Sequence, residues 1–160
     1  MMRITVIAVG KLKESFLLQG VNEYLKRLKG HVKVDVIEIA EEKEKGKTTA
    51  HETIRVIEEE GQRILRALPK DAYVVALDVQ GEMLTSHEFA DMIEHTMNYH
   101  SSSLAFIIGG SYGLAESIKE KSNRLISFSR LTFPHQLMRL IFFEQIYRAF
   151  MIMNSEPYHK

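Results

Sequence analysis

The sequence predicts an α/β domain in which a mostly parallel sheet carries helices on both faces. Short runs of apolar, often β-branched residues alternate along the chain with longer segments in which apolar residues recur every three or four positions. Most of the short runs lack polar interruptions, as do strands that are buried on both faces of a parallel sheet. With 160 residues the chain has the size of one domain, which we expect to span residues 1–160.

The first half of the chain contains two strand and helix units and an exposed loop. Gly30 ends the first helical segment as a C-terminal cap, and Pro69 ends the second because proline cannot continue a helix. A run rich in Lys and Glu lies between the units and cannot be buried. We therefore expect strands over residues 4–9 and 32–36, helices over 17–28 and 54–68, and an exposed loop over 41–47.

The second half continues the alternation of strands and helices. Thr85 with Glu88 three residues later forms a capping-box pattern, which predicts the start of a helix. We expect strands over residues 73–79, 104–108 and, more weakly, 125–128, a helix through 89–97, a short helix from about Leu114 and a long one from about Pro134.

The last helix has almost no polar face. Most positions from Leu137 to Met153 are apolar, and a helix that is apolar all round must be covered on all sides. It could be a central core helix. Because so small a domain can hardly surround it, we favour a homodimer interface built on this helix.

Composition excludes several classes of protein. The net charge is zero and there is no cysteine, so neither a disulfide framework nor a thiolate zinc site is available, and no metal is expected. No stretch approaches the roughly 20 apolar residues that cross a bilayer, and the first apolar run is too short for a signal peptide. We therefore expect a cytoplasmic protein without a membrane partner, whose C-terminal quarter is locally basic.

The stretch FIIGGSYGLAESI, residues 106–118, places glycines between an expected strand and an expected helix. Such a loop often binds phosphate, but the dinucleotide pattern G-x-G-x-x-G fails at Ile108 and the P-loop pattern is absent. The loop has no basic residue, and Glu116 in the first helical turn would repel an anion. Two interpretations remain: the glycines serve only a tight turn with positive φ, or their backbone approaches a flat ligand that is not strongly anionic.

Two other segments also end strands. They are residues 72–78, followed by Gly81, and residues 127–135. Ligands of open α/β sheets bind outside the carboxyl ends of the strands, so these three strand ends predict a pocket.

Four segments of the chain together carry a family resemblance. They are LAFIIGGSYGL at residues 104–114, LTFPH at 131–135, YRA at 147–149 and PYHK at 157–160. On these residues the chain resembles, over its full length, the RlmH (YbeA) family of the SPOUT methyltransferase superfamily. The resemblance implies a homodimer and a C-terminal trefoil knot, which no pattern of spacing predicts.

The resemblance also implies an activity. Members of this family use S-adenosylmethionine to methylate N3 of a pseudouridine in 23S ribosomal RNA of the large subunit, and an assembled ribosome could supply part of the recognition surface. The cofactor has no phosphate, which agrees with a glycine loop that lacks basic residues. On this chain the implied cofactor pocket involves the following residues: Leu77, Gly109, Phe128, Ser129, Arg130, Leu131, Thr132 and Phe133.

Transfer of an activated methyl group requires mainly that the nucleophilic nitrogen be held in line with the bond that breaks. Deprotonation of that nitrogen would help, and the candidates for a general base are His135, His159 and, more weakly, Glu144. His135 follows Pro134, so it could instead merely cap the last helix.

Four residues are expected at the substrate end of the site: Arg148, Tyr158, His159 and Lys160. Basic groups can meet phosphates, and aromatic rings can stack on an unpaired base. The alternative is a frayed tail, but a dimer could deliver this tail to the partner's cofactor pocket. Arg130 and Arg139 are expected to widen the basic surface.

Two rival interpretations belong to other functional classes. One is a nicotinamide- or nucleotide-binding enzyme. The other is a non-catalytic RNA-binding ribosome assembly factor that retains only the basic tail. A net charge of zero favours a local, structured RNA target over a sequence-independent coating of nucleic acid.

Overall fold

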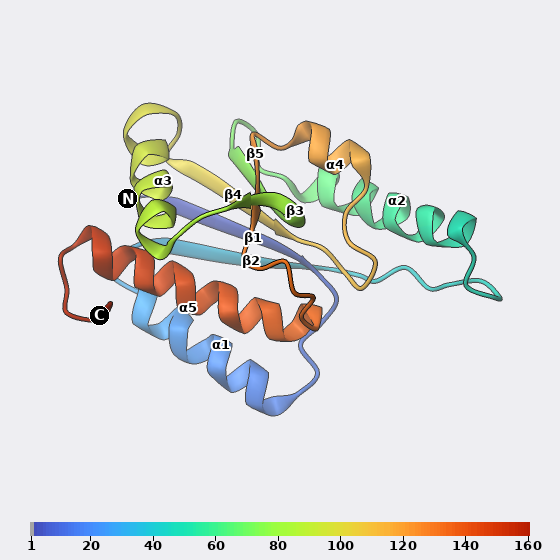
Figure 1. The fold of residues 1–160 in the computed structure, drawn as a ribbon, viewed down its shortest axis with the longest axis horizontal. Coiled ribbons are helices and arrows are strands. Elements are labelled where there is room, and N and C mark those ends of the chain that lie inside the picture. The colour runs from blue at the N-terminus through green and yellow to red at the C-terminus, as the bar shows by residue number, and fades with distance from the viewer. Residues whose placement is uncertain (1) are drawn as a thin grey trace.

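In the computed structural model, which describes residues 2–160, five parallel strands form one sheet (Figure 1). The strand order is β2-β1-β4-β3-β5, and every neighbouring pair is parallel. The predicted α/β class and the parallel sheet are thereby confirmed. The strands are β1 (Arg3–Val9), β2 (Lys33–Ile39), β3 (Tyr73–Met83), β4 (Ser103–Ile108) and β5 (Arg124–Ser127).

Helices cover both faces of the sheet, as predicted. One face carries α1, α3 and α5, and the other carries α2 and α4 (Figure 1). The helices are α1 (Ser15–Leu28), α2 (Ala50–Ala67), α3 (Ser86–Tyr99), α4 (Glu116–Lys121) and α5 (His135–Met153). Within residues 2–160 no helix combines the length and the apolar character that crossing a bilayer requires.

The central strands divide the core into two layers. Successive side chains of a strand point to opposite faces of the sheet, so Phe106 of β4 packs toward α3 and α5 while its neighbour Ile107 packs toward α2 and α4. Both side chains are fully buried. This explains why the central strands are mostly apolar, whereas β2 at the edge of the sheet leaves Val36 partly exposed.

Strand β3 is longer than the sequence predicted, and Gly81 is the reason. The pairing of β3 with β5 shifts register between Leu77 and Glu82. At the shift the two backbones approach so closely that a Cβ on Gly81 would lie 2.7 Å from the backbone N and C of Ile126. Only glycine fits there, so β3 can continue across β5 to Met83 instead of ending near Val79.

The last helix begins beside the carboxyl ends of β1 and β2 and packs between α1 and α3 (Figure 1). Phe142, Phe143 and Ile146 are fully buried, whereas Leu137 and Ile141 are only half-buried. The course of this segment is consistent with the threaded C-terminus that the family resemblance implies. Capping is as predicted for α3, where Thr85 Oγ1 accepts from the amide of Glu88 and the Glu88 carboxylate accepts from the amide of Thr85.

Arg139 corrects one expectation from the sequence. It was expected to widen the basic surface, but it is 1% exposed. Its guanidinium lies 2.5 Å from Glu38 Oε2 and donates to the backbone carbonyl of Gly10 at 2.9 Å. A charge can be buried at this level when it is paired and hydrogen-bonded. Arg139 therefore ties α5 to the ends of β1 and β2.

Candidate active site

The loops after β4 and β5, together with residues 77–79 in the middle of β3, enclose a cleft. Its volume is about 720 Å³ including the open mouth. Seven of the eight residues expected to hold the cofactor line this cleft: Leu77, Gly109, Phe128, Ser129, Leu131, Thr132 and Phe133. The parallel sheet brings them together because all its strands end at the same edge.

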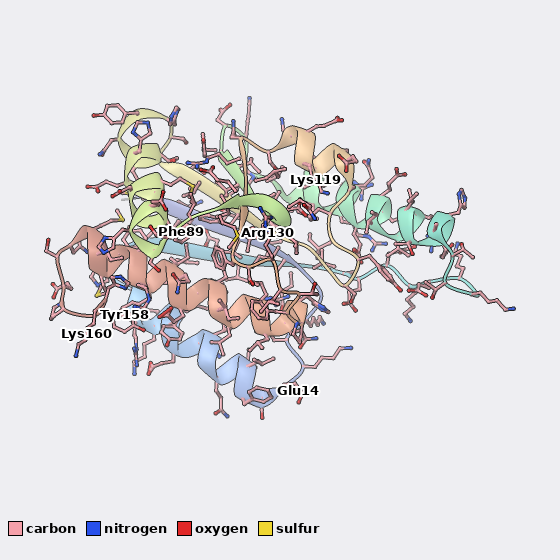
Figure 2. The ribbon with its side chains drawn as sticks, in the orientation of Figure 1. Glu14, Phe89, Lys119, Arg130, Tyr158 and Lys160 are labelled. Carbon is pink, nitrogen blue, oxygen red and sulfur yellow. The ribbon has the colours of Figure 1, made fainter. Side chains whose placement is uncertain are left out.

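Arg130, the eighth residue, does not line the cleft. Its guanidinium donates to the backbone carbonyl of Val79, and Figure 2 shows Arg130 beside the strands of the sheet. The arginine thus joins the loop after β5 to the end of β3. Its contact with the protein backbone indicates that it positions the wall of the cleft.

The glycine loop after β4 closes on itself. The amide of Gly113 donates to the carbonyl of Gly110 at 3.1 Å, and Gly113 has a φ of +88°. A Cβ on Gly109 would lie 3.0 Å from the backbone C and O of Gly113. Positive φ therefore explains only Gly113, and Gly109 is required by the tight turn itself as well as by any ligand that approaches it.

The charge of the cleft disfavours phosphate. None of its lining residues is a lysine or arginine, and the one acidic residue, Asp78, lies 3.6 Å from Lys119 Nζ. The walls are mainly apolar, from Leu77, Phe128 and Phe133, and exposed backbone of the glycine loop supplies polar groups. These residues fit the adenosine and sulfonium parts of S-adenosylmethionine, which carries no phosphate. No cluster of His, Asp or Glu side chains in residues 2–160 has a geometry that would hold a metal ion.

His135 lies at the mouth of this cleft, at the first position of α5. Its Nδ1 is 3.5 Å from Ser111 Oγ, and its buried Nε2 is 3.4 Å from Glu41 Oε1. The cap of α5 is Pro134, without a side-chain hydrogen bond. The helix-capping interpretation of His135 therefore has no support in the geometry, which instead places the imidazole between Ser111 of the glycine loop and Glu41.

The Lys- and Glu-rich loop, residues 41–47, is exposed as predicted but is held by ion pairs. Glu42 lies 2.7 Å from Arg55 and 2.6 Å from Arg63, and these guanidinium groups hold the pKa of Glu42 below its usual value. Glu44 accepts a hydrogen bond from the hydroxyl of Tyr112 in the glycine loop. Sequence reasoning missed this contact, because nothing in the residue pattern places a loop after β2 beside a loop after β4.

The C-terminal residues form a second cluster, at the far end of α5. The guanidinium of Arg148 makes two hydrogen bonds to the carboxylate of Glu144, at 2.8 and 3.2 Å. Tyr158 donates its hydroxyl to Glu144 Oε2 at 2.8 Å, and Arg148 lies over its ring. His159 completes the cluster, with Nδ1 2.9 Å from Arg148 Nη1. The tail is therefore packed on α5, and the alternative of a frayed tail is not what the structure shows.

The environment sets the protonation of this cluster. Burial and the hydrogen bond to Glu144 raise the pKa of the Tyr158 hydroxyl, which stays protonated. The same carboxylate raises the pKa of Arg148. His87, which sequence reasoning also missed, adds an edge-to-face ring contact to His159 with centroids 4.9 Å apart. Only the folding of α3 beside the tail reveals that contact.

The cleft and the C-terminal cluster are separated within one chain. Arg148 follows His135 by 13 residues on α5, which is about 20 Å along the helix at 1.5 Å per residue. Figure 2 shows Tyr158 and Lys160 at the end of α5 that is remote from Arg130. The expected cofactor residues thus lie together, and the expected substrate residues lie together, but one protomer does not join the two groups.

The fold is an open parallel α/β sheet, and its cleft at the strand ends is apolar and has no basic side chain to bind phosphate. These features are those of an enzyme that binds a nucleoside cofactor without phosphate groups. Comparison with known families makes the class specific. A family model described as "Predicted SPOUT methyltransferase" matches residues 2–159, and the chain belongs to this family.

The relatives narrow the family further. The chain is 48% identical over 159 residues to the ribosomal RNA large subunit methyltransferase H of Bacillus pumilus, with 99% of this chain and 100% of the relative covered. It is 51% identical to the protein of the same name from Enterococcus faecalis and 50% identical to that from Listeria monocytogenes, with the same coverage. The predicted family membership is thereby confirmed.

Two solved structures share the fold. A probable methyltransferase from Bordetella pertussis matches with a TM-score of 0.58 at 10% identity, over 93% of this chain and 95% of that one. A probable methylase family protein from Haemophilus influenzae matches with a TM-score of 0.53 at 12% identity, over 99% and 70% of the two chains. At these identities the likeness concerns the fold alone.

Proposed function

We propose that this protein is an S-adenosylmethionine-dependent methyltransferase that acts on N3 of a pseudouridine in 23S ribosomal RNA. The observation that carries the proposal is the cleft at the ends of β3, β4 and β5, which offers apolar walls and glycine-loop backbone but no basic side chain. Full-length similarity to proteins named ribosomal RNA large subunit methyltransferase H supports the same activity.

The cleft residues would hold the cofactor, whose sulfonium supplies an activated methyl group. Leu77, Phe128 and Phe133 provide apolar surface for the adenosine, and backbone groups near Gly109 can bind its polar edges, as glycine loops do when they approach a ligand closely. The side chain of Leu131 is 71% exposed at the mouth. We propose that these residues hold the methyl group still, so that the incoming nitrogen meets it in line.

The C-terminal cluster would receive the RNA. Lys160 offers positive charge to phosphates, Tyr158 and His159 offer rings to an unpaired base, and Arg148 holds His159 in place. We propose that a homodimer brings this cluster to the partner's cleft, because about 20 Å of helix separates the two groups of residues in one chain. Exposed Phe16 and Leu18 on α1, which packs beside α5, support an interface on this face.

The wider context is also proposed. Residues 1–160 would act as one catalytic domain in the cytoplasm, where the ribosome is the substrate, and the assembled large subunit would contribute to recognition. The zero net charge of the chain supports a local, structured RNA target rather than a sequence-independent coating of nucleic acid.

The test is methyl transfer from radiolabelled S-adenosylmethionine to intact ribosomes, with the label mapped to the large-subunit RNA. A methyl on N3 blocks the Watson–Crick edge, so reverse transcription should stop at the modified nucleotide. Deletion of residues 158–160 should abolish transfer while cofactor binding, measured by calorimetry, persists. Arg124→Met, which removes a surface ion pair, is the matched control and should transfer normally.

Two outcomes would contradict the proposal. Saturable binding of ribosomes without any label in the large-subunit RNA would indicate a non-catalytic assembly factor. A monomer by light scattering that still methylates would refute the shared site.

A further inference from the structure

The side chain of His159 is held in one orientation by Arg148, whose guanidinium can donate hydrogen bonds but cannot accept them. Arg148 Nη1 lies 2.9 Å from His159 Nδ1. A guanidinium has five N–H donors and no acceptor, so Nδ1 must be the acceptor of this hydrogen bond. In the neutral ring that the contact requires, the proton therefore lies on Nε2.

Arg148 is itself fixed by two neighbouring side chains. Its Nη2 and Nε bind the carboxylate of Glu144 at 2.8 and 3.2 Å, a two-point geometry that sets the plane of the guanidinium. The ring of Tyr158 lies beneath it, with Cζ 4.8 Å from the centroid. Glu144 also holds Tyr158 through the phenol hydroxyl. Side-chain exposure is only 24% for Arg148 and 18% for Glu144.

The groups around His159 come from three segments. Arg148 faces it from α5, the ring of His87 packs edge-to-face from α3, and Tyr158 and Lys160 flank it in the tail. Among the contacts of residues 2–160, the carboxylate of Glu144 reaches His159 only through Arg148. This arrangement lacks the carboxylate on Nδ1 that usually orients a histidine general base.

We propose that His159 is a hydrogen-bond donor to the target base and not the general base, and that Glu144 and Arg148 are positioning residues that hold the Nε2–H tautomer. The inference rests on the proposed function and names the part of the substrate that His159 meets. N3 of a uracil-type base lies between two carbonyl oxygens, which are acceptors. Donation from Nε2 to one of these oxygens would orient the base. The guanidinium of Arg148 would meanwhile hold the imidazole through Nδ1 on the opposite side of the ring.

The same hydrogen bond would also favour the reaction. The N3 proton would pass to water first. N3 would then form its bond to the methyl carbon as the carbon–sulfur bond breaks, and the sulfonium would become a neutral thioether. Negative charge that develops on N3 is shared with the flanking carbonyl oxygens. A preorganised donor at such an oxygen typically accounts for about 10²–10³ in kcat.

The first test is nitrogen NMR of the histidine rings at a pH well above the ordinary imidazole range. The signals of His159 among the seven histidines are identified by their loss in His159→Gln. We expect the wild type to show the Nε2–H tautomer alone, and Arg148→Met to show a mixture of both tautomers. A proton on Nδ1 in the wild type, or an unchanged pattern in Arg148→Met, would overturn the proposal without any reference to activity.

The second test separates a donor from a base. His159→Gln keeps an N–H donor at similar reach, so its kcat should stay within about tenfold of the wild type, whereas His159→Phe should lose about 10²–10³. The wild type and His159→Gln should share one pH profile. An acidic limb that disappears in His159→Gln would identify a general base and refute the donor role. If the wild type transfers no methyl group at all, the proposed function fails while the tautomer result stands independently.

Discussion

Arg139→Met removes the buried cation that joins α5 to the ends of β1 and β2, and its effect on stability can be worked out from the contacts. Arg139 lies 2.5 Å from Glu38 and 2.9 Å from the carbonyl of Gly10. A hydrogen bond that involves a charged group contributes roughly 1.5–3 kcal/mol, so the two contacts together account for about 3–6 kcal/mol. Methionine preserves most of the apolar volume of the arginine stem.

One feature lowers the expected loss of stability, and a second keeps it from vanishing. The side chain of Glu38 is 37% exposed, so water can solvate its carboxylate once the arginine is gone. The carbonyl of Gly10 is buried and stays without that donor. We therefore expect the free energy of unfolding to fall by about 3–4 kcal/mol, within the cost of about 3–5 kcal/mol for breaking a buried ion pair.

The assay is equilibrium unfolding in urea at one fixed protein concentration, because any dimer would make stability depend on concentration. Arg124→Met is the matched control: its guanidinium lies 2.6 Å from Glu82, but the two side chains are 30% and 58% exposed. A surface pair contributes roughly 0–1 kcal/mol. If Arg139→Met lowers the free energy of unfolding no more than Arg124→Met does, burial of the ion pair does not add to its contribution and the reasoning is refuted.

Three other changes test the fold. Gly81→Ala places a Cβ 2.7 Å from the backbone of Ile126, so it should destabilise the protein by about 1–3 kcal/mol and speed hydrogen exchange in β5; unchanged exchange would contradict the close approach. Thr85→Ala should cost about 1 kcal/mol in thermal unfolding, because it removes the cap of α3. Burial raises the pKa of Glu60, so the stability linked to its protonated form is full below the unfolded pKa and is lost as pH rises through the folded pKa. Glu60→Gln should therefore gain stability over the wild type between about pH 4 and 7, and an equal difference at both pH values would refute this.

Much of the fold followed from local patterns. All five strands and all five helices that the residue pattern predicted are present in residues 2–160, with ends displaced by a few residues. The cleft was also predictable, because parallel strands end at one edge, so that Leu77, Gly109 and Phe128 had to lie near one another. Hydrophobic periodicity is a property of short segments, so it can be recognised in the sequence without knowledge of contacts between distant residues.

The rest depended on contacts between distant segments. Arg139 had the appearance of a surface residue, since an arginine in a helix is usually exposed; only the arrival of β1 and β2 beside α5 buries it. The residues around Gly81 do not indicate that its backbone lies against the backbone of Ile126. The contact of His87 with His159 joins α3 to a tail more than 70 positions away, and no spacing rule relates them.

The sequence by itself determined the class of the protein, because hydrophobic periodicity sets the strands and helices and the order of these elements sets a parallel sheet. It also excluded a phosphate-binding loop, because residues 109–113 carry no basic side chain and Glu116 follows. Only the tertiary structure decided what each charged group does. In the folded chain Arg139 is buried, and Arg148 contacts both Glu144 and His159. The tail lies about 20 Å along the helix from the cleft. Charge and hydrogen bonding depend on distance and on access to water, and both are settled only when the chain has folded.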